Sequence, residues 1–241
     1  MWIIYWILFG AIMGSFSNML IWRLPRHENW VIKPSYCPNC GHRLGVLDLI
    51  PIVSYVILGG RCRYCKQPIS PRYLIVELIS ATLWGLVPLV YANYGLYYTI
   101  AYSVFVFFSL LLAVEDWYYQ EVQSVLLYIP LVAVGVLVWQ HWPAALFLCV
   151  MFLILYVFAL VVFKKEGLGD GDIIYAAACG FMITGPMQLG YFLLVCSAVG
   201  IVTALLYAVA THSTIKSLRF PFLPAMFAST VILILCGILA V

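Results

Sequence analysis

The sequence predicts an all-α polytopic membrane protein of about eight transmembrane helices with a small cytosolic zinc-binding loop domain. Of the 241 residues, 66% are hydrophobic and only 9% are charged, and the mean hydropathy is +1.07. A single water-soluble core would leave most of this apolar surface exposed. Two further observations support the class: apolar runs recur along the chain, and paired cysteines lie in its one long polar segment.

The apolar runs predict the individual helices, because about 20 apolar residues are needed to cross the hydrocarbon core of a bilayer. The predicted helices cover residues 2–22, 73–92, 97–115, 122–140, 144–163, 173–186, 188–210 and 222–241. The sixth of them is short. The first run lacks the basic n-region and small-residue cleavage site of a signal peptide, so we interpret it as a retained helix.

The chain is expected to have three parts: a first transmembrane helix at 1–22, a loop domain at 23–72 and a membrane-embedded domain at 73–241. Eight of the twelve Lys and Arg residues lie in the loop domain, and the other four lie in two later loops. The positive-inside rule therefore places these loops in the cytosol and, with eight helices, both termini outside. The net charge of +3 then reflects topology, so we expect lipid contact and no nucleic-acid partner.

The loop domain contains the stretches "CPNCGHRLG" and "CRYCKQPIS", whose two CxxC pairs are separated by 21 residues. Four thiolates, from Cys37, Cys40, Cys62 and Cys65, can close a tetrahedral shell around Zn²⁺. The alternatives are disulfides or cysteines without a role, and the reducing cytosol disfavours disulfides. A closed shell has no open position for water, which indicates a structural metal.

Acidic residues at membrane depth are costly and usually face a wet cavity or a partner. Glu77 lies about one turn inside the second predicted helix. It is expected to belong to the substrate or active-site residues, and an ion pair with Arg72 or Arg61 is the alternative. Glu115 and Asp116 follow the third apolar run, and an interfacial position beside neighbouring aromatic residues is the alternative to a catalytic one.

The stretch "GLGDGD" at 167–172 is harder to explain structurally. Its alternating glycines disfavour a regular helix and permit positive φ, so Gly169, Asp170 and Gly171 are expected to form a substrate or active-site loop. A second carboxylate from the third helix could share one proton with an aspartate of this stretch. The ionised member would activate water and the protonated one would polarise a scissile carbonyl.

Several motifs in order resemble those of the type IV prepilin peptidases, bacterial membrane aspartic proteases of the GxGD kind. The N-terminal signature is "GSFSNMLIWRLP", and the cysteine-bearing loop with its following "RYLIVEL" places Glu77 at a matching position. "GLGDGDIIYAAACG" and "FPFLPA" resemble the family's glycine–aspartate motif and the segment near its last helix. The likeness runs along most of the chain.

The resemblance implies cleavage of the basic leader from prepilin-like or pseudopilin substrates at the cytosolic face of the bacterial inner membrane. It places the catalytic pair at Asp116 and Asp172. Gln123 and Ser124 stand where the family usually has Pro and then Asp or Asn, and Ile174 stands where it often has Lys. These departures affect substrate detail and remove neither acid.

The family also implies N-methylation of the new N-terminus with S-adenosylmethionine. This second activity rests on the resemblance alone, because no glycine-rich loop after a strand is visible that would hold the cofactor. A different class of function stays open: a zinc-stabilised membrane transporter or assembly scaffold without protease activity. No inverted repeat is visible in the positions of the acids.

Spacing selects Asp172 over Asp170 as the partner of Asp116. Counted from Asp172, the small residues 176–178 and Gly180 fall where the family has them. Asp172 is predicted to begin the sixth helix, where the helix dipole stabilises a carboxylate. Asp170 is predicted to lie in the loop, more solvated, and to bind the basic leader of the substrate.

Overall fold

The computed structural model describes the whole chain except residues 1, 121, 123, 164–168, 212–220 and 237–241. The described residues are largely helical and form no strand, which confirms the predicted all-α class. They divide into two compact units, Met1–Leu89 and Val90–Val241.

The first unit pairs two long helices, α1 (Trp2–Arg23) and α3 (Arg72–Tyr91), of which α3 continues two residues into the second unit. Glycines let the two backbones approach: a Cβ at Gly10 would lie 2.5 Å from the Cβ of Trp84, and one at Gly14 would lie 2.8 Å from the Cα of Glu77. Close backbone approach over small residues is typical of helix pairs in membranes.

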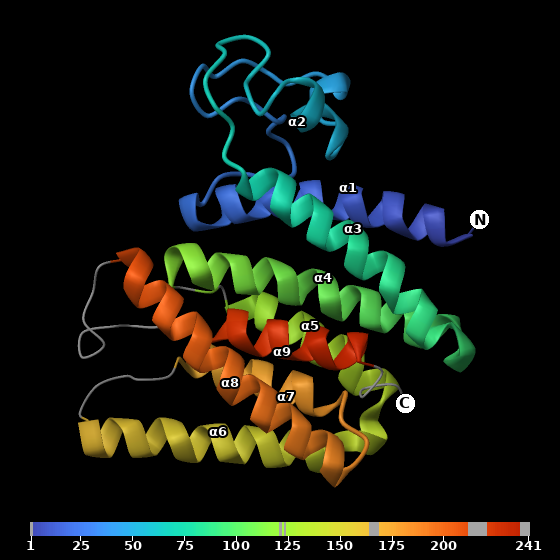
Figure 1. The fold of residues 1–241 in the computed structure, drawn as a ribbon, viewed down its shortest axis with the longest axis vertical. Coiled ribbons are helices and arrows are strands. Elements are labelled where there is room, and N and C mark those ends of the chain that lie inside the picture. The colour runs from blue at the N-terminus through green and yellow to red at the C-terminus, as the bar shows by residue number, and fades with distance from the viewer. Residues whose placement is uncertain (1, 121, 123, 164–168, 212–220, 237–241) are drawn as a thin grey trace. The chain divides into compact units, whose positions relative to one another are not determined.

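The segment between these helices contains no long element. It contains two 3₁₀ turns, η1 (Leu24–Arg26) and η2 (Val46–Asp48), and the short helix α2 (Val53–Ile57). In Figure 1 this segment lies above α1 and α3.

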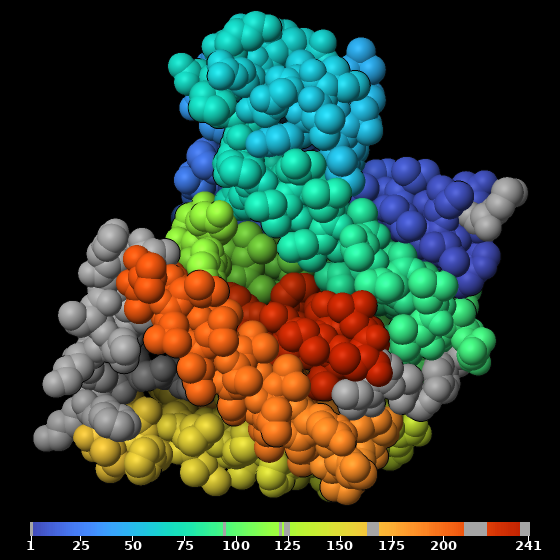
Figure 2. Space-filling model, in the orientation of Figure 1, coloured from blue at the N-terminus to red at the C-terminus, as the bar shows by residue number. Residues whose placement is uncertain are grey.

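The second unit contains six helices within its described residues. They are α4 (Leu96–Tyr119), α5 (Ser124–Leu137), α6 (Trp142–Phe163), α7 (Asp170–Gly180), α8 (Pro186–Thr211) and α9 (Leu223–Leu235), with 3₁₀ turns η3 (Ala92–Tyr94) and η4 (Trp139–His141). Helix α4 packs on α5 and α9, α7 packs on α5 and α6, and α8 packs on α9. Figure 2 shows α8 and α9 side by side on one face of this unit.

Each of the eight predicted helices has a counterpart in the structure, but not every counterpart is long enough to span a bilayer. Within the described residues, five helices are long and apolar enough to cross a membrane: α1, α3, α4, α6 and α8. Helices α5 and α9 are shorter apolar helices. The 11 residues of α7 rise only about 16 Å, roughly half the hydrocarbon thickness.

Two predictions about the sixth helix are wrong. It ends at Gly180, not at residue 186, and it begins at Asp170, so Asp170 and Gly171 lie in its first turn and not in a loop. The reason is a local cap: Gly169 is extended, and its N–H donates to Oδ2 of Asp172 over 2.9 Å. This bond satisfies one of the N–H groups that a helix start leaves unpaired, so the helix can include the glycine that follows Asp170.

Helices α6 and α7 approach each other closely at Gly180. A Cβ at Gly180 would lie 2.4 Å from the Cα of Ala145 and 2.9 Å from the carbonyl oxygen of Ala144. Backbone atoms cannot move aside as a flexible side chain can, so this position requires glycine.

We therefore expect Gly180→Ala to separate α6 from α7 and to lower stability by about 1–3 kcal/mol. The measurement is thermal unfolding of the purified chain in detergent. Gly190→Ala is the matched control, because a Cβ there meets nothing within 4 Å. Equal unfolding temperatures for the two variants would contradict the close-packing interpretation.

Candidate functional site

The two CxxC pairs form the same turn twice. An isolated antiparallel bridge, Tyr36 with Arg43, encloses the first pair, and another, Arg61 with Pro68, encloses the second. In the first turn Gly41 takes a φ of 70°, and in the second Lys66 takes a φ of 61°. Positive φ is easily adopted by glycine and strained for lysine, so the second turn is held by its surroundings.

These turns bring the four predicted sulfur ligands together. The Sγ atoms of Cys37, Cys40, Cys62 and Cys65 all lie within 4.8 Å of one another, and Cys37 and Cys65 are 3.9 Å apart. A tetrahedral Zn²⁺ with bonds of about 2.3 Å requires sulfur separations of about 3.8 Å, so the residues fit such an ion. All eight cysteines are free thiols, so the alternative of disulfides does not apply.

The thiols of the cluster differ in acidity. Against a backbone hydrogen bond from Gln67, burial and hydrogen bonds with the neighbouring thiols raise the pKa of Cys65 to about 11. A hydrogen bond from the backbone of Cys65, with a weaker one from Tyr64, lowers the pKa of the Cys62 thiol to about 7. A thiolate is the form of cysteine that binds metals. The prediction that a tetra-cysteine cluster forms in the loop domain is confirmed.

Asp48 connects the second turn to η2. Its carboxylate accepts hydrogen bonds from Nε of Arg63 at 2.6 Å, from the hydroxyl of Tyr64 at 3.0 Å and from the N–H of Gly45 at 3.1 Å. The Arg63 guanidinium lowers the pKa of Asp48. His42 stacks on Tyr64 with ring centroids 3.6 Å apart, which joins the two turns and gives this histidine a packing role.

The hydrogen-bond partner of Glu77 is a backbone amide of the loop domain and not the side chain of Arg72 or Arg61. It is 6% exposed, and its Oε2 accepts a hydrogen bond of 2.7 Å from the backbone N–H of Ile52. Ile52 has φ 65° and ψ −54°, and Val53 donates to the carbonyl oxygen of Pro51 over 2.6 Å. This is a γ-turn of the rare positive-φ kind, which is strained for a β-branched residue. Glu77 therefore stabilises a strained turn that begins α2.

Asp116 and Asp172 approach each other from segments far apart in the chain. Asp116 lies in the last turn of α4 and Asp172 in the first turn of α7, and their charges are close enough to interact. Asp116 accepts a hydrogen bond of 3.2 Å from the N–H of Leu223, the first residue of α9. Both helices also pack on α5 and α9, which holds the two ends together.

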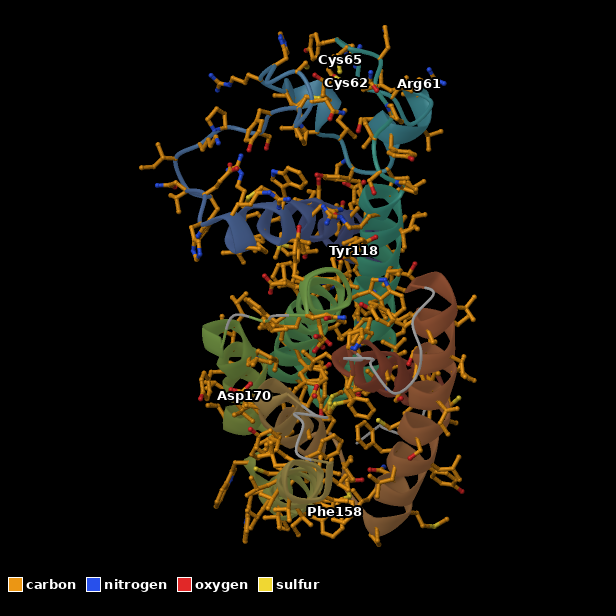
Figure 3. All side chains as sticks on the ribbon, turned by 90° about the vertical axis from the view of Figure 1, so that its left-hand side faces the viewer. Arg61, Cys62, Cys65, Tyr118, Phe158 and Asp170 are labelled. Atoms are coloured by element: carbon orange, nitrogen blue, oxygen red, sulfur yellow. The ribbon has the colours of Figure 1, made fainter. Side chains whose placement is uncertain are left out.

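The two aspartates of the glycine-rich stretch have different environments. Asp172 is buried, whereas Asp170, labelled in Figure 3, is exposed and accepts a hydrogen bond from the N–H of Gly171. Gly171 lies against α5, where a Cβ would be 3.1 Å from Cδ1 of Leu127. The bond between Asp172 and Gly169 also gives Asp172 a structural role as a helix cap, besides any catalytic one.

Glu115 and Asp116 differ although they are adjacent. Glu115 is 1% exposed, and its carboxylate oxygens have no hydrogen-bond partner among the described residues. Asp116 is only partly buried and is bound to α9. Of the two acids, Asp116 is the one whose charge interacts with that of Asp172.

Sequence reasoning missed two features beside the aspartates. The first is the Leu223 amide, for which the motif "FPFLPA" offered a signal, since Pro224 marks the first turn of a helix. The second is Tyr175, a fully buried residue one turn after Asp172, which faces Ser109 and stacks on Phe105 at 6.1 Å. No local pattern separates such a tyrosine from an ordinary packing residue.

Comparison with known proteins finds relatives of nearly the whole chain. Residues 8–91 match the bacterial peptidase A24 N-terminal domain, and residues 103–241 match the type IV leader peptidase family. The type 4 prepilin-like proteins leader peptide-processing enzyme of Escherichia coli O78:H11 is 31% identical, covering 88% of this chain and 86% of that protein. The prepilin leader peptidase/N-methyltransferase of Bacillus subtilis is 31% identical, covering 95% and 92%. No solved structure matches the chain.

The bond between Glu77 and Ile52 generates a prediction. Glu77→Ala removes the acceptor of the Ile52 amide, so the strained turn should relax and the amides of 52–57 should exchange about tenfold faster. Glu77→Gln keeps an acceptor oxygen of similar reach and is expected to stay near the wild-type rate. Hydrogen exchange followed by mass spectrometry makes the measurement. Equal exchange in the Ala and Gln variants would show that this bond does not hold the turn.

Proposed function

Because this chain belongs to the type IV leader peptidase family, we propose that it removes the basic leader from prepilin-like proteins with Asp116 and Asp172 as its catalytic pair. The observation that carries the proposal is the convergence of these two aspartates from α4 and α7. The family match favours a peptidase over the alternative of a transporter or scaffold.

The backbone contacts of the pair suit an aspartic protease. One carboxylate oxygen of Asp116 is held by the Leu223 amide, and one of Asp172 is held by the Gly169 amide, which orients the second oxygen of each side chain. In the proposed reaction the ionised aspartate takes a proton from water, and the oxygen of that water attacks the scissile carbonyl. The protonated aspartate donates a hydrogen bond to the carbonyl oxygen. The tetrahedral intermediate then breaks its C–N bond, and the leaving amine takes up a proton from the pair.

We further propose that the pair faces the cytosol from the inner membrane. Five apolar helices and the relatives identify a membrane protein of this kind. The concentration of Lys and Arg in residues 23–72 supports a cytosolic loop domain, and the outside position of both termini follows if the shorter helices also count as spans. Exposed Asp170 lies near Asp172, where its charge would attract a basic leader.

N-methylation of the new N-terminus, with S-adenosylmethionine as the methyl donor, is the proposed second activity. The support comes from the names of relatives: the B. subtilis protein is called a prepilin leader peptidase/N-methyltransferase, whereas the E. coli name mentions leader-peptide processing alone. Cleavage and methylation can be separated in one reaction, because methylation changes the mass of the mature product and not that of the leader.

The loop domain is proposed to hold one structural Zn²⁺ through Cys37, Cys40, Cys62 and Cys65. The fit of the four sulfurs to a tetrahedral ion supports this proposal. Such an ion supplies folding free energy and, with its shell filled by four thiolates, takes no part in bond breaking.

The first test uses purified chain, a synthetic prepilin-like substrate and mass spectrometry of both fragments. We expect Asp116→Asn or Asp172→Asn to lower kcat at least about a thousandfold, and the double variant to be little worse, because the aspartates act as a unit. Binding of substrate to the inactive variants controls for folding. Multiplicative losses in the double variant would refute the shared-proton scheme, and full activity in either single variant would refute the assignment.

Asp170→Asn tests the choice between the two aspartates of α7. Because Asp170 is exposed and is not the partner of Asp116, its replacement should keep at least about half of kcat and raise KM by no more than about fivefold. Asp172→Asn at equal expression and membrane insertion is the comparison. The reverse pattern would show that Asp170 is the catalytic residue.

Metal analysis tests the cysteine site. The wild-type chain, prepared without chelator, should contain about one equivalent of zinc, and Cys37→Ser combined with Cys40→Ser should release nearly all of it. The helices should remain inserted, because the ligands all lie in the loop domain. Cys149→Ser is the matched control, since this cysteine lies in α6 outside the cluster. Less than about half an equivalent in wild-type protein would count against the site.

A further inference from the structure

An apolar surface is exposed on the loop domain beside α2. Seven aliphatic side chains of residues 46–57, here called the 46–57 patch, are exposed; they are Val46, Leu47, Leu49, Ile50, Val53, Val56 and Ile57. Val46 is 83% exposed and Ile57 is 76% exposed. A loop domain surrounded only by water does not gain stability from such a cluster, and exposed apolar patches commonly mark an interaction surface.

The bond between Glu77 and Ile52 determines the level at which this patch lies. Ile52 is in the middle of the 46–57 segment, and its amide contacts Glu77 over 2.7 Å. Glu77 is five residues beyond Arg72, the first residue of the membrane-spanning helix α3, and five residues rise about 7.5 Å. The patch is therefore fixed beside the end of a membrane helix and not far out in the cytosol. Figure 1 shows α2 above α1 and α3.

The charge of the same loop domain fits an anionic surface. Residues 23–72 contain eight Lys and Arg and only two acids, Glu28 and Asp48. Both acids are already engaged, Glu28 with Lys33 and Asp48 with Arg63. Arg43 and Lys66, by contrast, are exposed. Each cation near an anionic leaflet contributes favourably to membrane association.

We propose that the 46–57 patch inserts into the boundary between headgroups and acyl chains of the leaflet in which α3 begins, and that anionic phospholipid headgroups bind the exposed cations of the loop domain. Burial of apolar side chains combined with attraction of cations is the general basis of interfacial membrane binding. The loop domain is thus a membrane-bound domain that contacts lipid, with Glu77 holding the inserted segment at the correct level.

A photocrosslinking experiment identifies what covers the patch. Ile57→p-benzoylphenylalanine is introduced into the full-length chain, which is placed in lipid nanodiscs of phosphatidylcholine with or without phosphatidylglycerol and then irradiated. Intact-mass analysis should show a phospholipid adduct that increases with phosphatidylglycerol. Asn39→p-benzoylphenylalanine is the matched control, because Asn39 is exposed in the first cysteine turn and should give few lipid adducts.

Two variants test the causes separately. Val56→Ser combined with Ile57→Ser, and Arg43→Gln combined with Lys66→Gln, should each speed the exchange of the 46–57 amides in anionic nanodiscs by at least about threefold. Retained zinc shows that the domain is still folded. Crosslinks from position 57 to residues 90–241 or to a second chain instead of lipid, or equal exchange of wild type and variants in anionic lipid, would overturn the proposal.

Discussion

The cost of placing a carboxylate at membrane depth is the constraint on which the rest of this structure depends. Three buried or half-buried acids offset this cost in the same way: each accepts a hydrogen bond from a backbone N–H at the start of a short helix. Glu77 uses the N-cap of α2, Asp172 uses the N-cap of α7, and Asp116 uses the first residue of α9. The N–H groups at a helix start lack partners within their helix, so each contact satisfies both groups.

This arrangement also positions the parts of the protein. The bond of Asp116 ties the end of α4 to the beginning of α9, 107 residues later in the chain. The bond of Asp172 starts α7 early enough to place its carboxylate in the first turn, near Asp116. Glu115 is the exception among these acids, because it is buried without a hydrogen-bond partner in the described part of the chain. A carboxyl group in such a site is far more easily accommodated in its neutral form.

The loop domain is held together by a small number of specific contacts. With no extended core available, two similar turns are joined by four sulfurs, by the contacts of Asp48 with Arg63 and Tyr64, and by the stacking of His42 on Tyr64. A metal ion suits a segment of this size, which buries too little apolar surface to be stable by itself. The apolar side chains that remain exposed are then available to the membrane beside which Glu77 holds them.

The sequence by itself determined the features that depend on composition and short spacing. Hydropathy indicated the membrane class, and the two CxxC pairs indicated the sulfur cluster. These are local properties, because neighbouring residues on one turn or helix have nearly the same geometry in any fold. Only the tertiary structure decided the partner of Glu77, the Leu223 contact of Asp116 and the burial of Glu115. Each of these depends on segments that meet after folding, and no periodicity within one segment encodes the distance to another.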